Sequence, residues 1–136
     1  TGDAHIFVGI EISSGDSEKQ ALIEKLRKSF EVLDMSDNSM AKTHIRYMVG
    51  GHANAENEVI YRFEFPERPG ALLNFLKKIK TKWNISLFHY RNHGADFGRV
   101  LIGLQADNVA ELEARFDELG YYYKNETDNK AYQYFL

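Results

Sequence analysis

The segment from Phe65 to Leu72 (FPERPGAL) holds residue types that could bind a small charged ligand. Pro69 suits the first position of a helix, because its missing N–H would have no partner there. Gly70 lets a ligand approach the backbone closely, and the free N–H groups of a helix start favour an anion such as a carboxylate. Leu72 and Leu76 lie one helical turn apart and could border an apolar pocket. The segment therefore predicts either a site for an aliphatic amino acid or a rigid connection between a strand and a helix.

Residues for catalysis or metal binding have no recognisable arrangement. His89 is expected in a strand and His93 in a turn near Asp96, so their spacing does not place them on a shared face, and neither has the context of a zinc motif. His44 and His52 are similarly isolated. The chain has no cysteine, no serine in a Gly-x-Ser-x-Gly elbow and no glycine-rich phosphate loop. We therefore predict no catalytic residue and no metal ligand in this chain.

The composition is that of an ordinary soluble globular protein, with 43% hydrophobic and 27% charged residues among 136. The net charge is -3 and the charges are interspersed, which argues against nucleic-acid binding because a binder needs a basic surface. No apolar run reaches the roughly 20 residues of a membrane span, and no signal peptide is recognisable. Together with the lack of cysteine, this favours a cytoplasmic location and no membrane contact.

The second half of the chain has the order strand, helix, strand, strand, helix, strand. Val59, Tyr61 and Phe63 alternate with other types, which is typical of a strand. Asn108 is spaced to cap one helix, and Gly120 to end it. We expect strands at 58–66, 83–92, 98–105 and 121–126, and helices at 69–79 and 108–119. This order predicts an α+β, ferredoxin-like fold, in which two helices cover one face of an antiparallel sheet.

The first half has weaker signals for the same kinds of element. Isoleucine or valine recurs at every second position between His5 and Ser13, which predicts a strand with one buried face. Ser17 and Gln20 have the spacing of a capping box, and a helix is expected after it with an apolar stripe of Leu22, Leu26 and Phe30. We also expect a short strand at 31–35, a turn at 36–40, an extended piece at 43–49 and a polar linker at 50–57.

The two halves can be aligned as copies of one unit. Val8-Gly9-Ile10 corresponds to Ile102-Gly103-Leu104, 94 residues later, and Ser36-Asp37-Asn38 corresponds to Thr127-Asp128-Asn129, 91 residues later. By this alignment the first copy begins at its third strand, so the chain has the pattern of a truncated protein. We therefore expect a partial subdomain at 1–49, a linker at 50–57 and a complete subdomain at 58–136. The unpaired edge of the partial copy predicts self-association, because exposed edges recruit other chains.

Several stretches of sequence resemble one enzyme family closely. They are FPERPGAL at 65–72, WNISLFHYRNHG at 83–94 and ADFGRV at 95–100, with Met40-Ala41-Lys42 and HIRYMVGG at 44–51. These stretches resemble the C-terminal regulatory region of biosynthetic threonine deaminases, also called threonine dehydratases or threonine ammonia-lyases. The resemblance covers essentially the whole chain. It implies a pair of ACT-like subdomains, of which the second is complete here.

The resemblance implies regulation and no catalysis by this chain itself. In that family a pyridoxal-phosphate domain converts threonine to 2-oxobutanoate and ammonia, and the ACT-like pair binds isoleucine as feedback inhibitor, with valine opposing it. Family members assemble as homo-oligomers. The cofactor and its lysine belong to the catalytic domain, which this chain lacks, so we expect the chain to bind no cofactor and to have that domain as its partner.

The resemblance also implies where the effector would bind. In an ACT-like unit the effector lies where the first strand meets the first helix, against the neighbouring strand or subdomain. The matching positions here are Glu67, Gly70, Ala71, Leu72 and Leu76, with Asn84, Ile85 and Phe88 nearby.

Three other functions remain open at this point. The first is a free-standing amino-acid-binding ACT module that is not fused to an enzyme. The second is a ferredoxin-like nucleic-acid-binding domain that stacks bases on Phe63, Phe88 and Tyr90. The third is a small metalloenzyme that uses His89 and His93.

Overall fold

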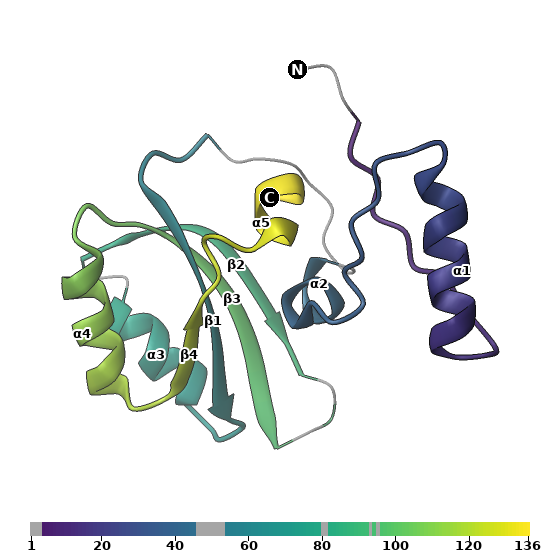
Figure 1. Cartoon of the computed structure of the whole chain (residues 1–136). Helices are drawn as coiled ribbons and strands as arrows, with labels where there is room; N and C mark the ends of the chain where they lie inside the picture. Colours follow the sequence, from purple (N-terminus) through teal and green to yellow (C-terminus); the bar gives the residue numbers. More distant parts are fainter. Residues whose placement is uncertain (1–3, 46–53, 80–81, 93, 95) are drawn as a thin grey trace.

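The computed structural model describes residues 4–45, 54–79, 82–92, 94 and 96–136 (Figure 1). Its helices are α1 (Asp16–Arg27), α2 (Ser39–Thr43), α3 (Ala71–Ile79), α4 (Val109–Leu119) and α5 (Lys130–Phe135). Its strands are β1 (Glu58–Pro66), β2 (Asn84–Arg91), β3 (Phe97–Gln105) and β4 (Tyr122–Asn125). In the described part of the chain, no helix has the length and apolar character that crossing a membrane requires.

The four strands form one antiparallel sheet with β1 near its middle. The strand order is β2-β3-β1-β4. β1 pairs with β3 along its whole length, from Glu58 opposite Gln105 to Pro66 opposite Phe97, and its middle part, residues 61–64, pairs with β4. This is the predicted ferredoxin-like order, and the α+β fold class is confirmed.

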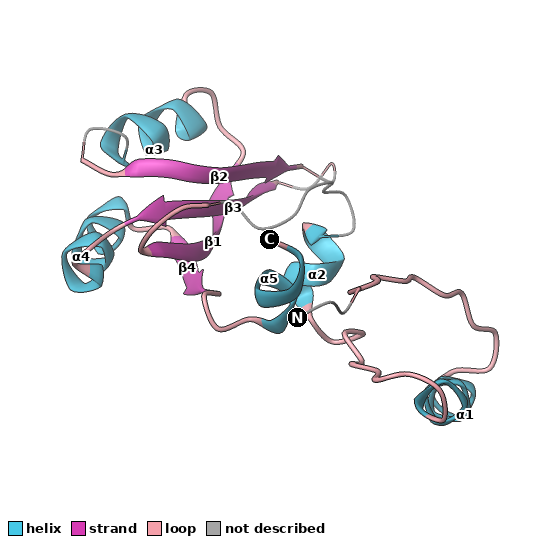
Figure 2. Ribbon diagram, turned by 90° about the horizontal axis from the view of Figure 1, so that it is seen from above, coloured by secondary structure: helices cyan, strands magenta, loops and turns pink. Residues whose placement is uncertain are grey.

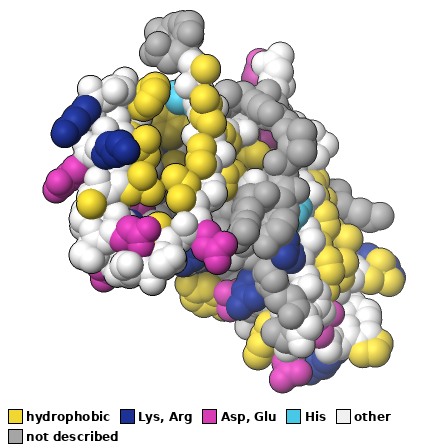
Figure 3. Space-filling view, turned by 90° about the vertical axis from the view of Figure 1, so that its right-hand side faces the viewer, with side chains coloured by type: hydrophobic (Ala, Val, Ile, Leu, Met, Phe, Trp, Pro, Cys, Tyr) yellow, Lys and Arg dark blue, Asp and Glu magenta, His cyan; other side chains and the backbone are white. Residues whose placement is uncertain are grey.

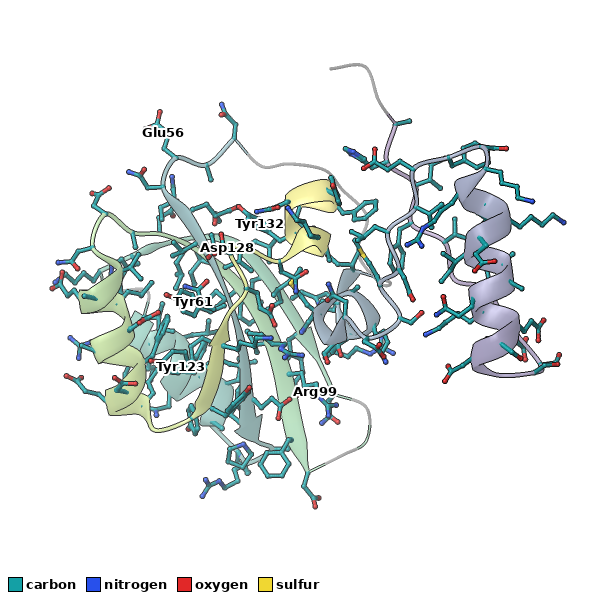
Figure 4. The ribbon with its side chains drawn as sticks, viewed as in Figure 1. Glu56, Tyr61, Arg99, Tyr123, Asp128 and Tyr132 are labelled. Atoms are coloured by element: carbon teal, nitrogen blue, oxygen red, sulfur yellow. The ribbon has the colours of Figure 1, made fainter. Side chains whose placement is uncertain are left out.

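Helices α3 and α4 cover one face of the sheet (Figures 1 and 2). Aromatic side chains form much of the core beneath them. The ring of Phe63 lies 4.8 Å from Phe75 of α3 and 4.7 Å from Phe116 of α4, and all three side chains are fully buried. Tyr61 lies between the sheet and α4 (Figure 4) and donates a 2.7 Å hydrogen bond to Glu113. Burial raises the pKa of Tyr61 well above its ordinary value, so its hydroxyl stays a donor. The predicted pair of helices on one face is therefore confirmed.

The helix ends in this half follow two of the three predicted local signals. The side chain of Asn108 accepts a 3.1 Å hydrogen bond from the N–H of Glu111, as an N-cap does. Gly120 ends α4 in the left-handed conformation, with φ of 72°. The predicted helical position of Pro69 is wrong, because α3 begins at Ala71.

The opposite face of the sheet is also covered, by the short helices α2 and α5 (Figure 2). Met40 and Ala41 of α2 and Ala131 of α5 are fully buried against Ile60 and Leu101, which project from this face. Sequence analysis expected a turn at α2 and nothing at α5. These helices give the sheet a second apolar core.

Two histidines meet beneath α2. His44, just after this helix, is fully buried, and its Nδ1 lies 2.7 Å from Nδ1 of His89 on β2. The rings are nearly perpendicular, with centroids 5.0 Å apart. One ring donates and the other accepts, so the contact requires at least one neutral imidazole. Sequence analysis treated both as isolated residues.

The strand expected between His5 and Ser13 is absent. The described residues of this stretch belong to no helix or strand, and Ile6, Val8 and Ile10 are 79%, 62% and 53% exposed. A strand is stable only when a neighbour pairs with it, and none of β1 to β4 does so here. Figure 3 views the molecule from the side on which α1 lies in Figure 1, and hydrophobic side chains are visible on that surface.

The capping box expected at Ser17 and Gln20 is also wrong. α1 begins at Asp16, and its N-cap is Gly15, which has no side chain to accept a hydrogen bond. Glu18 instead accepts hydrogen bonds from the N–H groups of two residues before the helix. The start of α1 is therefore stabilised by the Glu18 carboxylate, which the spacing of Ser17 and Gln20 did not indicate.

The connection from α1 to the sheet differs from the expected one as well. No strand forms at 31–35, and Phe30, assigned to the apolar stripe, lies beyond α1 and is 67% exposed. The turn expected at 36–40 is present at its start, where residues 36 and 37 form a turn closed by the hydrogen bond from Asn38 N–H to the carbonyl of Met35, but α2 begins at Ser39. The expected extended piece at 43–49 starts with the last residue of α2, and its positions 46–49 lie outside the described residues, as do 50–53 of the linker.

We predict that lowering the pH destabilises the fold through His44. Burial first, then the charges of His89 and three arginines, lower the pKa of His44 from 6.5 to about 3. Between about pH 6.5 and about pH 3 the unfolded chain binds a proton at His44 that the folded chain does not. The free energy of unfolding therefore decreases as the pH is lowered through this range. His44 contributes a slope of up to about 1.4 kcal/mol per pH unit.

Urea unfolding at several values between about pH 7.5 and about pH 4.5 measures this slope. The His44→Leu variant should have a shallower slope than the wild type. His5→Gln, a change at an exposed histidine, is the matched control. Equal slopes in wild type and His44→Leu would contradict the assignment.

Candidate functional site

An open pocket of about 440 Å³ lies where β1 ends and α3 begins. It is lined by Phe65, Glu67, Arg68, Gly70, Leu72, Leu73 and Leu76. The lining combines an acidic side chain, a basic side chain, a helix start and several apolar side chains. The pocket therefore has the size and the mixture of groups to hold a small amphoteric molecule.

The backbone at the helix start supplies hydrogen-bond donors to this pocket. Gly70 has φ of 82°, a left-handed conformation that residues with a Cβ rarely adopt. Its carbonyl accepts from the N–H of Asn74 at 2.9 Å, the first helical hydrogen bond of α3. The N–H groups of Leu72 and Leu73 belong to the first turn, which has no earlier helical carbonyl to bond. Such groups favour a negatively charged ligand atom.

Glu67 is held at the rim of the pocket by contacts from β2 and from the residue before β3. Its N–H donates to the carbonyl of Asp96 at 2.8 Å, and its carboxylate accepts from the hydroxyl of Tyr90 on β2. That hydrogen bond to Glu67 raises the pKa of Tyr90 above its ordinary value. Gly98 makes room for the pair, since a Cβ there would lie 2.8 Å from the Tyr90 ring and against the Glu67 carboxylate. The result is an oriented, exposed carboxylate that can accept from an ammonium group.

Apolar side chains form the rest of the pocket wall. Phe65 is 1% exposed and lies 6.3 Å from the ring of Tyr90, nearly parallel to it. Leu72 and Leu76 are half-buried and pack against the main core, whereas Leu73 is 55% exposed. An aliphatic side chain placed here would lose water contact on several sides. The arrangement provides binding groups for a carboxylate, an ammonium and an aliphatic chain.

The residues assigned by resemblance fall into two groups. Four of them, Glu67, Gly70, Leu72 and Leu76, line the pocket. The fifth residue of this segment, Ala71, is half-buried beside them against the main core.

The other three assigned residues lie on β2 and do not line this pocket. Asn84 pairs with Gln105 at the opposite end of the sheet, and its side chain donates to that of Gln105 at 2.5 Å. Ile85, its neighbour, packs into the main core. Phe88 is 39% exposed near the middle of the strand.

Sequence reasoning missed five residues of this region. Phe65, Arg68 and Leu73 line the pocket, and Tyr90 and Gly98 hold Glu67 in place. Phe65 and Arg68 belong to the FPERPGAL segment and Leu73 follows it directly. Assigning the whole segment and its next residue to the site would have included all three. Tyr90 and Gly98 come from other strands, and only the sheet pairing brings them to Glu67.

The alternative sites can now be compared with the structure. Phe63, named as a base-stacking residue, is fully buried under the helices and cannot stack on a nucleotide. His93 lies outside the described residues, and His89 contacts His44 instead. Among the residues that the structure describes, no group of three or more histidine, aspartate or glutamate side chains is placed to hold a metal ion.

The fold defines the class of protein. The strand order and the two helices on one face of the sheet define an ACT-like α+β fold of the ferredoxin type. A family model described as the C-terminal regulatory domain of threonine dehydratase matches residues 49–136. The chain belongs to this family of regulatory domains.

Curated relatives match almost the whole chain. The biosynthetic L-threonine dehydratase IlvA of Escherichia coli (strain K12) is 49% identical over 137 residues, which is 98% of this chain and 27% of the relative. The enzyme of the same name from Haemophilus influenzae (strain Rd) is 48% identical over 98% of this chain and 26% of the relative. The mitochondrial threonine dehydratase of Saccharomyces cerevisiae is 46% identical over 98% and 24%. The chain thus spans about a quarter of the length of these relatives.

We predict that Glu67→Gln lowers the pKa of Tyr90 toward its ordinary value of 10.0. The change removes the negative charge that the neutral hydroxyl now faces, so loss of the phenolic proton becomes easier. NMR of ring-labelled tyrosine can follow the Tyr90 signal between about pH 8 and about pH 10.5. Glu64→Gln, at an acidic residue of β1 that pairs with Arg99, is the matched control. A Tyr90 titration unchanged by Glu67→Gln would rule out the contact.

Proposed function

We propose that this chain senses isoleucine and regulates a threonine dehydratase to which it belongs. The family of the chain is that of C-terminal regulatory domains of threonine dehydratase. The observation that supports the ligand is the pocket between β1 and α3, which combines a helix start, the Glu67 carboxylate and an apolar wall. These three features match the three parts of an aliphatic amino acid.

In the proposed complex the ligand carboxylate accepts from the first-turn N–H groups of α3 and faces Arg68. The ammonium group donates to the Glu67 carboxylate, which Tyr90 orients. The aliphatic side chain lies against Leu72 and Leu76. Each group of the ligand then has a partner of complementary chemistry.

This wall distinguishes between similar amino acids to different degrees. Valine lacks one methylene of isoleucine, which is worth about 1 kcal/mol of apolar contact, so both should bind. Threonine would place its hydroxyl against Leu72 and Leu76 and leave it without a hydrogen bond, which costs about 1–3 kcal/mol. The proposed site therefore prefers isoleucine to the substrate of the enzyme.

The proposal includes the parent protein. There a catalytic domain would deaminate threonine to 2-oxobutanoate with pyridoxal phosphate, in the cytoplasm or an organelle that carries out isoleucine synthesis. Isoleucine would inhibit by binding one state of the enzyme more tightly, typically by about 1–3 kcal/mol, and valine would oppose it. The names of the relatives and the share of their length that this chain matches support a longer parent. They favour it over a free-standing module.

Pyridoxal phosphate does not fit the pocket of this chain. The cofactor needs a lysine for its Schiff base and donors for its phosphate. The described lining of the pocket contains no lysine. We therefore assign the cofactor to the catalytic domain and no catalytic step to this chain.

Self-association through the first half also remains part of the proposal. Ile6, Val8 and Ile10 are exposed at alternating positions, and an apolar surface of this kind is more stable when another chain covers it. We propose that the parent is a homo-oligomer.

We predict that isoleucine gives saturable heat with this chain in titration calorimetry, and that threonine gives a weaker signal. Leu72→Trp should abolish the isoleucine signal, because the larger side chain fills the pocket. Gly98→Ala should weaken binding by about tenfold or more, because it displaces the Glu67 carboxylate that holds the ammonium group.

Gly9→Ala is the matched control for the glycine change, since a Cβ at Gly9 would meet nothing within 4 Å. It should bind isoleucine like the wild type. Unchanged binding in Leu72→Trp would place the site elsewhere, and a wild-type chain without any saturable heat would refute isoleucine binding by this chain.

A further inference from the structure

We infer that Asn38 and Asn129 form a reciprocal hydrogen-bonded pair at the interface between the two halves of the chain, and that this pair transmits the effector signal between them. The two side chains exchange hydrogen bonds with each other. Asn38 Nδ2 donates to Asn129 Oδ1 at 2.8 Å, and Asn129 Nδ2 donates to Asn38 Oδ1 at 3.3 Å. Both side chains are half-buried.

The same two residues also begin the two short helices. Asn38 is the N-cap of α2 and accepts from the N–H of Ala41 at 3.0 Å. Asn129 is the N-cap of α5 and accepts from the N–H of Ala131 at 2.9 Å. Each amide therefore binds its own helix through its oxygen, and it binds the other half through both its oxygen and its nitrogen. A movement of one helix start changes the hydrogen bonds of the other.

The pair lies at matching positions of the internal repeat. Asn38 and Asn129 are 91 residues apart, the spacing that relates the turn at 36–38 to the turn at 127–129. A residue that contacts its own repeat equivalent, with reciprocal bonds, lies at an approximate two-fold axis. The two halves therefore meet symmetrically at this point.

Contacts on either side of the pair support the same symmetry. α2 packs on Leu101 of the sheet, and the repeat equivalent of Leu101 is Phe7. Phe7 in turn contacts α5, with its ring 5.7 Å from that of Phe135. Each short helix thus covers the equivalent residue of the other half, although the segment around Phe7 forms no strand.

A buried polar network connects Asn129 to the centre of the sheet. Asn129 Nδ2 donates to Glu126 at 2.8 Å, and the Glu126 carboxylate lies 3.3 Å from Arg62 on β1. Glu126 is 4% exposed, and its N–H donates to the carbonyl of Ile60 at 2.8 Å. β1 also carries Phe65 and leads into the proposed ligand pocket. A continuous set of contacts therefore runs from this strand to Asn38 in the first half.

The regulatory part of this inference rests on the proposed function. A ligand at the end of β1 can affect the first half only through contacts that both halves share. The Asn38–Asn129 pair is such a contact, and it has partners on both sides. We assign both residues a positioning role in regulation, with no contact to the ligand itself.

The experiment replaces each asparagine by aspartate, which caps a helix as well as asparagine does but lacks the Nδ2 donor. The variants are Asn38→Asp and Asn129→Asp. Asn108→Asp is the matched control, because Asn108 caps α4 within the second half. Hydrogen exchange of the backbone amides in the 136-residue chain is measured first.

We expect an effect that crosses the interface. Asn129→Asp should accelerate exchange in α2, at the N–H groups of Lys42 and His44, by roughly two- to tenfold. Asn38→Asp should do the same in α5, at Gln133 and Leu136. The control should affect neither helix. Exchange that changes only in the helix of the substituted residue would overturn the interface.

The second readout is inhibition of the full-length parent enzyme by isoleucine. Asn38→Asp and Asn129→Asp should raise the isoleucine concentration for half inhibition or lower the maximal inhibition, with uninhibited turnover as in the wild type. In calorimetry both variants should bind isoleucine with the same affinity as the wild-type chain. Inhibition equal to the wild type in both would overturn the regulatory role. A wild-type enzyme that does not respond to isoleucine refutes the proposed function instead, and the exchange result still decides the interface.

Discussion

The structure depends on the covering of both faces of β1. This strand has hydrogen-bonded neighbours on both sides, and its side chains alternate between two cores. Phe63 and Phe65 face α3 and α4, whereas Ile60 and Arg62 face α2 and α5. A one-residue change in the pairing of β1 would exchange these two sets and place Arg62 in the aromatic core. The burial of both faces therefore fixes the register of the whole sheet.

The position of the pocket follows from this register. Where β1 ends, the chain must turn into α3, and Gly70 makes that turn in a left-handed conformation. The pairing with β3, and of β3 with β2, brings Gly98 and Tyr90 to Glu67 at the same end of the sheet. A helix start, an oriented carboxylate and an apolar wall thus meet without any long loop. The site is a consequence of how the central strand ends.

Sequence analysis predicted the second half well because its signals are local. The Asn108 cap and the Gly120 helix end form within one helix, and the alternation in β1 was a correct signal because β3 and β4 pair with that strand. The first half was predicted poorly because a strand at His5 requires a pairing neighbour, and alternation alone does not provide one. The His44–His89 contact and the Tyr90–Glu67 hydrogen bond join residues far apart in sequence, so no local pattern indicates them. Four of the eight assigned effector residues line the pocket. The three on β2 do not, because the sequence does not indicate which end of β2 lies near the pocket.

The central claim is that isoleucine binds at the junction of β1 and α3. Backbone amide NMR of the labelled chain during a titration with isoleucine tests it most directly, because it locates the ligand residue by residue. We expect saturable shifts that are largest at Glu67 and at Gly70 to Leu73, with a smaller response at Tyr90 and Gly98. Saturable shifts centred on α1, or on α2 and the sheet face beneath it, with the junction unchanged, would contradict it.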